Sequence, residues 1–507
     1  MSIVLTGNDL TFAQLYAVAL QHEPVSLAPE AITRMKASRA VVDKLVAEGQ
    51  TAYGINTGFG KLASVRISSE QVRQLQVNLV RSHACGVGTL LSEAETRAMI
   101  LLRANALAKG LSGTRPLVVE TLCAMLNNGI QPLIPSQGSV GASGDLAPLA
   151  HLAQVVIGEG DAIYKDEKVT GEEAMKRALI APVALEAKEG LSLLNGTQGM
   201  LALLSLALRE ADMLADTADV AASLSLDALR GSPGAFDARI MHARAYSGAA
   251  TTARNLAHLN DGSQIRESHR SPDADRRVQD AYSLRCTPQV HGAVRDSLLQ
   301  AREMALVELN SATDNPLVFV NKSGGGDIIS GGNFHGQPLA MAADQVAIAL
   351  ATLSGIAERR IEQMTNPLTS MLPAFLTPDP GLNSGFMIVQ VTAAALTSEN
   401  RALATPHSVD SISTSGNQED YVSMGMSGAR RLEHMLQNLR NILAIELLCA
   451  CQGIDLLAPL QTGTLAKKAQ EAVRAVSSKV TADRSLAPDV NAVAALVGSG
   501  AIAKILQ

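Results

Sequence analysis

The sequence predicts a mainly α-helical protein, in which a bundle of long helices follows a more irregular, loop-rich N-terminal part. Hydrophobic residues make up 47% of the 507 residues and charged residues only 18%, which indicates much buried aliphatic surface. Residues 199–229 are apolar on nearly every side, as is typical of a helix inside a bundle. A continuous apolar stripe at helical spacing is formed by Leu432, Met435, Leu436, Leu439, Ile442 and Leu443.

Three parts are expected along the chain. Residues 1–200 form the loop-rich helical part, and within it residues 31–47 are predicted to form one amphipathic helix. Residues 201–455 form the central long-helix bundle, interrupted by a short strand-like segment at 317–320. Residues 456–507 form short C-terminal helices.

The composition excludes several classes of function. Lys and Arg total 42 against 48 Asp and Glu, and a net charge of -6 disfavours nucleic acid or an anionic membrane as partner. The five scattered cysteines indicate reduced thiols, and the sequence shows neither a signal peptide nor an apolar run of membrane-spanning length. The ten histidines lack metal-ligand spacing, so no metal is expected. A cytoplasmic protein is therefore expected.

The central motif is the segment 138–151, which reads GSVGASGDLAPLAH and contains Ala142-Ser143-Gly144. Small residues allow positive φ and close backbone approaches. In such a turn the Gly144 amide nitrogen can reach the Ala142 carbonyl carbon and close a five-membered ring. Loss of two waters, one of which carries the Ser143 hydroxyl, would leave a methylidene on an imidazolone, an electrophile that no ordinary side chain supplies. The alternative is a glycine-rich turn before a helix.

Three further candidates lie in the N-terminal part, each with a structural alternative. Tyr53 begins the run YGINTGFG, and by itself it could be a half-buried tyrosine with a satisfied hydroxyl. A partial dinucleotide fingerprint at 58–63 has no strand before it, which disfavours a nucleotide site. His83, in RSHACG, could be structural, and Asn195, in NGTQ, could mark a turn.

The later part of the chain adds a polar cluster and two single positions. Gln279, Tyr282 and Arg285 are spaced closely enough in one loop to converge on a ligand. The guanidinium fork matches a carboxylate, although a surface loop with a solvated Arg is the alternative. Phe334, in GGNFHG, could be a core aromatic, and Glu419, in NQED, could be a solvated carboxylate.

Together these motifs resemble the aromatic amino-acid ammonia-lyase and aminomutase family, in the family's own order, over about residues 51–455. The resemblance implies a 4-methylidene-imidazol-5-one formed autocatalytically from Ala142-Ser143-Gly144, with no external cofactor. It also implies a small-molecule amino-acid substrate and a homotetramer whose active sites are shared between subunits.

The resemblance further implies roles for the matching residues. Tyr53 would be an acid/base group, and Tyr282 would be the base that removes the β-proton of the substrate. Asn195 would hydrogen-bond the prosthetic ring and the substrate amine, and Arg285 would anchor the carboxylate. The other residues implied to line the site are Gln279, Phe334, His83 and Glu419.

Two of these positions bear on the substrate. In the family, the position of His83 touches the substrate ring, and a His there suits an imidazole, although tyrosine enzymes also place His in that pocket. Glu419 stands where the phenylalanine enzymes usually have Gln. The expected reaction is elimination of ammonia from L-histidine to trans-urocanate, with tyrosine or phenylalanine ammonia-lyase or aminomutase chemistry as the alternative. Ala281 and Tyr421 depart from the family's Pro and His.

Two alternatives belong to other classes of function. A serine amidohydrolase could use Ser143 as nucleophile, but the G-x-S-x-G pattern and a paired base are missing. A non-catalytic helical scaffold would need only the long helices, but no repeat of fixed period supports it.

Overall fold

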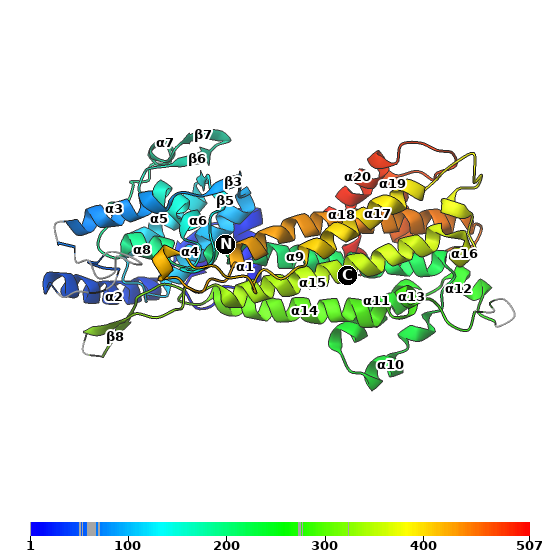
Figure 1. Ribbon diagram of the computed structural model, residues 1–507, viewed down its shortest axis with the longest axis horizontal. Coiled ribbons are helices and arrows are strands. Elements are labelled where there is room, and N and C mark those ends of the chain that lie inside the picture. Colours follow the sequence, from blue (N-terminus) through cyan, green and yellow to red (C-terminus); the bar gives the residue numbers. More distant parts are fainter. Residues whose placement is uncertain are drawn as a thin grey trace. The chain divides into compact units, whose positions relative to one another are not determined.

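The structure is a computed structural model (Figure 1), and it describes residues 2–49, 52, 54–57, 67–68, 71–271, 275, 277–322 and 324–506. Helices dominate these residues and the strands are short, which confirms the predicted mainly α-helical class. The chain folds into two compact units. Unit 1 comprises Met1–Leu206, Arg302–Asp344 and Pro406–Arg430, and unit 2 comprises Ala207–Ala301, Gln345–Thr405 and Arg431–Gln507. Each unit combines three separate stretches of the chain, so the units do not correspond to the three consecutive parts expected from the sequence. That three-part division stays a prediction.

Unit 1 contains shorter helices whose first residues carry ordinary start signals. Thr11 and Ser92 form capping boxes, and Pro29 and Pro116 stand where a missing N–H costs nothing. The helices are α1 (Phe12–Gln21), α2 (Pro29–Ala47), α3 (Val72–His83), α4 (Glu93–Ala108), α5 (Pro116–Asn127), α6 (Leu146–Val156), α7 (Gly171–Arg177) and α8 (Glu189–Leu194). The helix expected at 31–47 is therefore confirmed as the body of α2.

The strands found among the described residues of unit 1 form four small sheets. β1 (Ile3–Leu5) pairs in parallel with β2 (Val25–Leu27), and every other pair is antiparallel. The remaining strands are β3 (Val87–Leu90) with β5 (Pro135–Gln137), β4 (Gln131–Pro132) with β6 (Asp161–Tyr164) and β7 (Glu167–Thr170), and β8 (Leu317–Val320) with β9 (Gly326–Ile329). β8 confirms the strand expected at 317–320.

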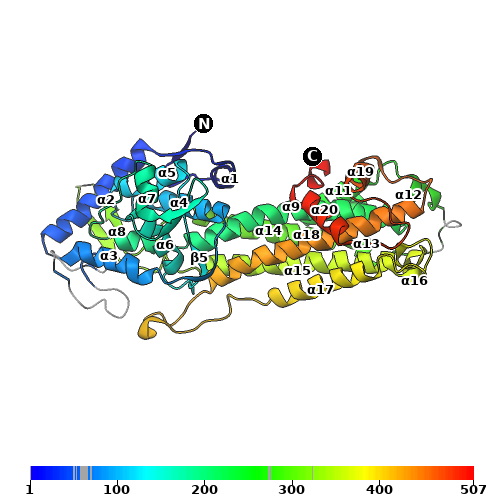
Figure 2. The same cartoon turned by 90° about the horizontal axis from the view of Figure 1, so that it is seen from above.

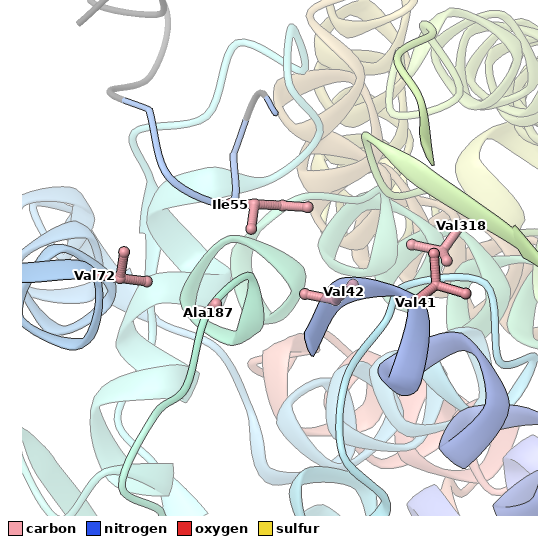
Figure 3. Close-up of a cluster of buried hydrophobic side chains, with 6 residues drawn as sticks. All are labelled: Val41, Val42, Ile55, Val72, Ala187 and Val318. Atoms are coloured by element: carbon pink, nitrogen blue, oxygen red, sulfur yellow. The ribbon is translucent and has the colours of Figure 1, made fainter. Parts of the chain in front are cut away.

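One apolar cluster of unit 1 holds several chain segments that carry site residues (Figure 3). Ile55 is close in sequence to Tyr53, Val72 begins the helix that ends at His83, and Ala187 and Val318 flank segments discussed below. Val41 and Val42 of α2 complete the buried cluster. Because protein interiors are close-packed, this cluster fixes where those segments leave the core.

Unit 2 contains the long helices, and the chain passes between the units within four of them: α9 (Gln198–Ala228), α14 (Thr287–Leu309), α15 (Gln337–Thr365) and α18 (Gly425–Leu456). Within unit 2 these helices run side by side in both views (Figures 1 and 2). The stripe predicted from Leu432 to Leu443 lies wholly in the α18 core, which confirms it. The shorter elements are α10 (Ala238–Ala243), α11 (Ser247–Leu259), α12 (Gln264–Ser268), α13 (Tyr282–Arg285), α16 (Pro367–Ser370), α17 (Met387–Leu403), α19 (Thr464–Val476) and α20 (Ala487–Gly498).

The core of unit 2 also encloses charge. Arg360 of α15 and Glu446 of α18 are fully buried, and the Arg360 Nη2 donates to Glu446 Oε2 at 3.1 Å. Ser225 of α9 donates its hydroxyl to Glu446 Oε1 at 2.8 Å. Charges removed from water need partners of this kind, since an unpaired buried ion costs several kcal/mol.

Among the described residues, only α15 is long and apolar enough to cross a membrane, and 67% of its most apolar window is buried inside the structure. Such burial is typical of a core helix.

Candidate functional site

The predicted ring-forming segment is a tight turn that only glycine allows at two positions. Gly141 and Gly144 have φ values of 68° and 71°. A Cβ atom added to Gly144 would lie 2.1 Å from the Gly196 carbonyl oxygen, and one added to Gly141 would lie 2.2 Å from Ser423 Oγ. At Gly144 the contact is with backbone, so this position requires glycine for space as well as for φ, whereas at Gly141 the contact is with a side-chain hydroxyl and the positive φ is the main requirement.

This turn is held by three other segments of unit 1. Asp145 N donates to Gly196 O at 2.7 Å, beside a parallel bridge between Gly144 and Gly196. The other contacts are Met424 N to Val140 O at 2.8 Å, Ser423 Oγ to Gly141 O at 3.0 Å and Gly336 N to Gly141 O at 3.2 Å. The turn is therefore fixed before any ring closes.

The residues present fit the imidazolone that the sequence implies. In the described chain, the Gly144 amide nitrogen donates to no carbonyl, so it is available to attack the Ala142 carbonyl carbon. Ala142 is buried and Ser143 is half-buried, which keeps most water away from the two carbonyls. Gly196 packs directly against Gly144 and leaves no room for the turn to open.

Glu419 lies at the Ser143 hydroxyl. Ser143 Oγ donates to Glu419 Oε1 at 2.9 Å, and Thr414 Oγ1 donates to Glu419 Oε2 at 2.6 Å. Each carboxylate oxygen keeps a further lone pair. The two residues are 276 positions apart in sequence, and the fold brings them into contact.

His83 is the last residue of α3, and a backbone carbonyl determines which of its ring nitrogens carries the proton. Its Nδ1 lies 2.9 Å from the Leu79 carbonyl oxygen, which can only accept, so Nδ1 carries the proton and Nε2 is left as an acceptor. Burial lowers the pKa of His83, and the Leu79 carbonyl and the charge of Glu419 oppose this only in part. Burial therefore favours the neutral form of His83.

Asn195 lies between α8 and α9 and is buried. Its Nδ2 donates to Asp314 Oδ1 at 3.3 Å and to the Asn315 carbonyl at 3.1 Å. The Asn195 carbonyl accepts from Arg103 Nη1 at 2.9 Å. Its neighbour Gly196 contacts the ring-forming turn, so Asn195 lies one residue from that turn's main support.

Asp145 is a buried group whose role the sequence did not indicate. It is the N-cap residue directly before α6, but its side chain makes no capping hydrogen bond there. Instead Oδ2 accepts from Met200 N at 2.8 Å, in the first turn of α9, and Oδ1 accepts from Ser139 Oγ at 2.9 Å. Burial raises the pKa of Asp145 to about 6, although these hydrogen bonds favour the charged form.

This raised pKa predicts a pH-dependent stability. The folded protein binds a proton at Asp145 more tightly than the unfolded chain does, so the stability it contributes is complete below about pH 4 and is lost as pH rises through about 6. The wild-type chain should therefore lose about 2 kcal/mol of unfolding free energy relative to Asp145→Asn between pH 4 and 7. Denaturant unfolding of both proteins across this range measures the difference. A difference that does not change with pH would contradict the assignment.

The structure places Gln279, Tyr282 and Arg285 together in unit 2, on and just before the short helix α13. The Arg285 guanidinium carbon lies 4.7 Å from the centroid of the Tyr282 ring, a cation–π distance. Tyr282 is 71% exposed, whereas Arg285 Nε is buried and has no hydrogen-bond partner among the described residues. Ala281 has a φ of -58°, a value that Pro would also adopt.

The remaining predicted residues are placed as follows. Tyr53 lies outside the described residues. Phe334 is half-buried in the turn before α15. Tyr421, the departure from the family pattern, stacks on His335 with ring centroids 6.1 Å apart, and its carbonyl accepts from His335 Nε2 at 3.2 Å. Tyr421 thus packs against the segment that contains Phe334.

Comparison with known proteins gives consistent results. The family model described as aromatic amino acid lyase matches residues 10–475. A curated relative named histidine ammonia-lyase, from Koribacter versatilis, is 56% identical over 98% of both chains. The crystal structure of histidine ammonia-lyase from Trypanosoma cruzi has a TM-score of 0.90 and 42% identity, and the match covers 100% of this chain and 95% of that one. The tyrosine aminomutase from Streptomyces globisporus has a TM-score of 0.94 and 39% identity, covering 100% and 98%.

Proposed function

The chain belongs to the aromatic amino acid lyase family, and we propose that it is the member that eliminates ammonia from L-histidine to give trans-urocanate. Close relatives over the full chain bear the name histidine ammonia-lyase, which supports this assignment. Elimination requires an electrophile for the amine, an anchor for the carboxylate and a base for the weakly acidic β-proton.

The observation that supports the choice of histidine is a pair of acceptors: Glu419, which contacts Ser143, and His83, on which the charge of Glu419 acts. Neutral His83 offers Nε2 as an acceptor, and Glu419 offers carboxylate lone pairs. An imidazole N–H can satisfy such acceptors, whereas a phenyl ring would leave them unpaired. A site built for hydrogen bonds rejects an analogue that lacks the donor.

Ala142-Ser143-Gly144 would hold the prosthetic group, a 4-methylidene-imidazol-5-one made from the chain itself without an external cofactor. This group supplies an electrophilic carbon that makes ammonia a better leaving group. Arg285 would bind the carboxylate through its unpaired Nε, and Tyr282 would take the β-proton. Tyr53 would transfer a second proton, and Gln279 and Phe334 would complete the pocket.

The test is turnover of L-histidine, L-tyrosine and L-phenylalanine by the purified protein without added cofactor. Urocanate, followed by ultraviolet absorbance, is the expected main product. His83→Leu should lower kcat/KM for L-histidine by roughly tenfold to a hundredfold, because it removes an acceptor from the ring pocket. Coumarate, cinnamate or a β-amino acid as main product would favour the tyrosine or phenylalanine lyase or the aminomutase instead. No product from any of them would overturn the assignment.

A homotetramer with shared active sites is the proposed assembly. The 17-residue helix α17 is largely apolar, yet only Ala393, Thr397 and Asn400 are buried in it. Ile388 and Val391 are 66% and 51% exposed. Exposed apolar surface of this kind marks a protein contact. Light scattering should give four times the 53.0 kDa chain mass, and a monomer would contradict the proposal.

The cytoplasm is the proposed compartment. All five cysteines are free, and burial raises the pKa of Cys123 and Cys451 to about 12, so these thiols are unreactive. Free thiols are typical of proteins in a reducing compartment.

A further inference from the structure

A buried cluster of charged side chains contacts Asn195 in unit 1. Lys188, Asp314 and Arg103 have at most 2% of their surface exposed, and Lys188 Nζ donates to Asp314 Oδ2 at 2.6 Å. Lys188 also adopts a left-handed backbone, with φ 75°. A buried lysine in a strained left-handed conformation persists only where its surroundings fix it, and such residues often serve a site.

The Asp314 carboxylate accepts from four donors. Oδ2 receives Lys188 Nζ and, at 3.0 Å, Ser192 Oγ. Oδ1 receives the Asn315 N–H at 2.7 Å and Asn195 Nδ2 at 3.3 Å. Only a carboxylate accepts from all four, because an amide in its place would turn a donor toward one of them.

These contacts decide which way the Asn195 amide points. Both groups near its Nδ2, the Asp314 carboxylate and the Asn315 carbonyl, are acceptors, so the NH₂ end must face them. Asn195 Oδ1 is buried and has no hydrogen-bond partner among the described residues. A buried acceptor without a donor is unfavourable, so this oxygen is poised for a donor that arrives with a ligand.

We propose that Asp314, held by Lys188, is a positioning residue that locks the Asn195 amide with Oδ1 free to accept a hydrogen bond from the substrate amine. The inference rests on the proposed function, which provides an amino-acid substrate. Asp314 acts through Asn195 and does not itself touch the substrate. Arg103, which binds the Asn195 carbonyl, fixes the backbone of the same residue.

Ligand binding to the full chain tests this without turnover. In the Ser143→Ala background, calorimetry compares L-histidine with 3-(imidazol-4-yl)propionate, which lacks the amine. Asp314→Asn should weaken L-histidine binding by roughly tenfold to a hundredfold, the range for a hydrogen bond to a charged group, and change binding of the amine-free analogue less than about twofold. Equal weakening of both ligands would overturn the proposal, since a merely structural role affects both.

A double-mutant cycle tests independently whether Asp314 acts through Asn195. In an Asn195→Ala protein, Asp314→Asn should weaken L-histidine binding no further, because its route of action is gone. Additive losses would overturn the proposal. The matched control is Glu189→Gln, a buried carboxylate at the start of α8 that binds Arg115 and, within the described part of the chain, makes no hydrogen bond to Asn195. Its effect should be alike for both ligands.

Ser192→Ala covers the case in which Asp314→Asn does not fold. It removes one donor to Asp314 and should weaken L-histidine binding alone, by roughly threefold. Absence of any ligand-specific loss would overturn the proposal. Failure of the proposed function is distinct from these results: the wild-type protein would then form no urocanate, whatever the Asp314 variants bind.

Discussion

Ser143→Ala should lower turnover of L-histidine by roughly a thousandfold or more while the fold survives. Without the hydroxyl no water can leave from this side chain, so no methylidene can form. The structural cost is small, because Ser143 is half-buried and its side chain makes one hydrogen bond, to Glu419. Losing a hydrogen bond to a charged carboxylate costs about 1.5–3 kcal/mol, less than the usual stability of a folded domain.

Two measurements check this result. Urocanate absorbance gives kcat, and intact-mass spectrometry reports the ring itself, since a matured wild-type chain is lighter than its sequence by two waters. The matched control is Ser139→Ala in the same turn, whose hydroxyl only binds Asp145 and nearby backbone. It should lose no more than about tenfold in kcat. An active wild-type chain with its full mass would contradict the ring.

Tyr282→Phe should lower kcat by roughly a hundredfold to ten-thousandfold, the usual contribution of a positioned base. The hydroxyl is the only group removed, and the ring can still stack on Arg285. Because Tyr282 is 71% exposed, the melting temperature should hardly change.

Tyr246→Phe is the matched control for that variant. Tyr246 is 57% exposed in the same unit, and the Arg244 guanidinium carbon lies 5.1 Å from its ring centroid. It therefore has the same chemistry and the same kind of partner, without a predicted role. Its kcat should stay within about twofold of wild type. Equal losses in the two variants would show that Tyr282 is not the base.

The sequence predicted best what depends on local spacing. The apolar period of α18 follows from residues a few positions apart. The sequence also places Tyr282 and Arg285 in one short segment, but it did not predict that their side chains stack on each other. The tight turn at Gly144 was also predicted, because a cluster of small residues in the sequence indicates a backbone with positive φ.

Contacts between distant segments could not be predicted in this way. Asp145 binds Met200, 55 residues later, and Lys188 binds Asp314, 126 residues later. The sequence around Asp145 does not indicate Met200 as its partner, and the sequence around Lys188 does not indicate Asp314. Likewise, the sequence shows that α17 is apolar but not that only three of its residues are buried, because burial depends on which helices pack around it.

The buried ion pair of Arg360 and Glu446 affects how the stability of unit 2 changes with temperature. Hydration of ions becomes less favourable as temperature rises, so the penalty for keeping both groups dry falls on warming. Their mutual attraction is retained, since Glu446 also holds Ser225 and neither oxygen depends on water. The pair should therefore oppose thermal unfolding of unit 2 more strongly when hot than when cold.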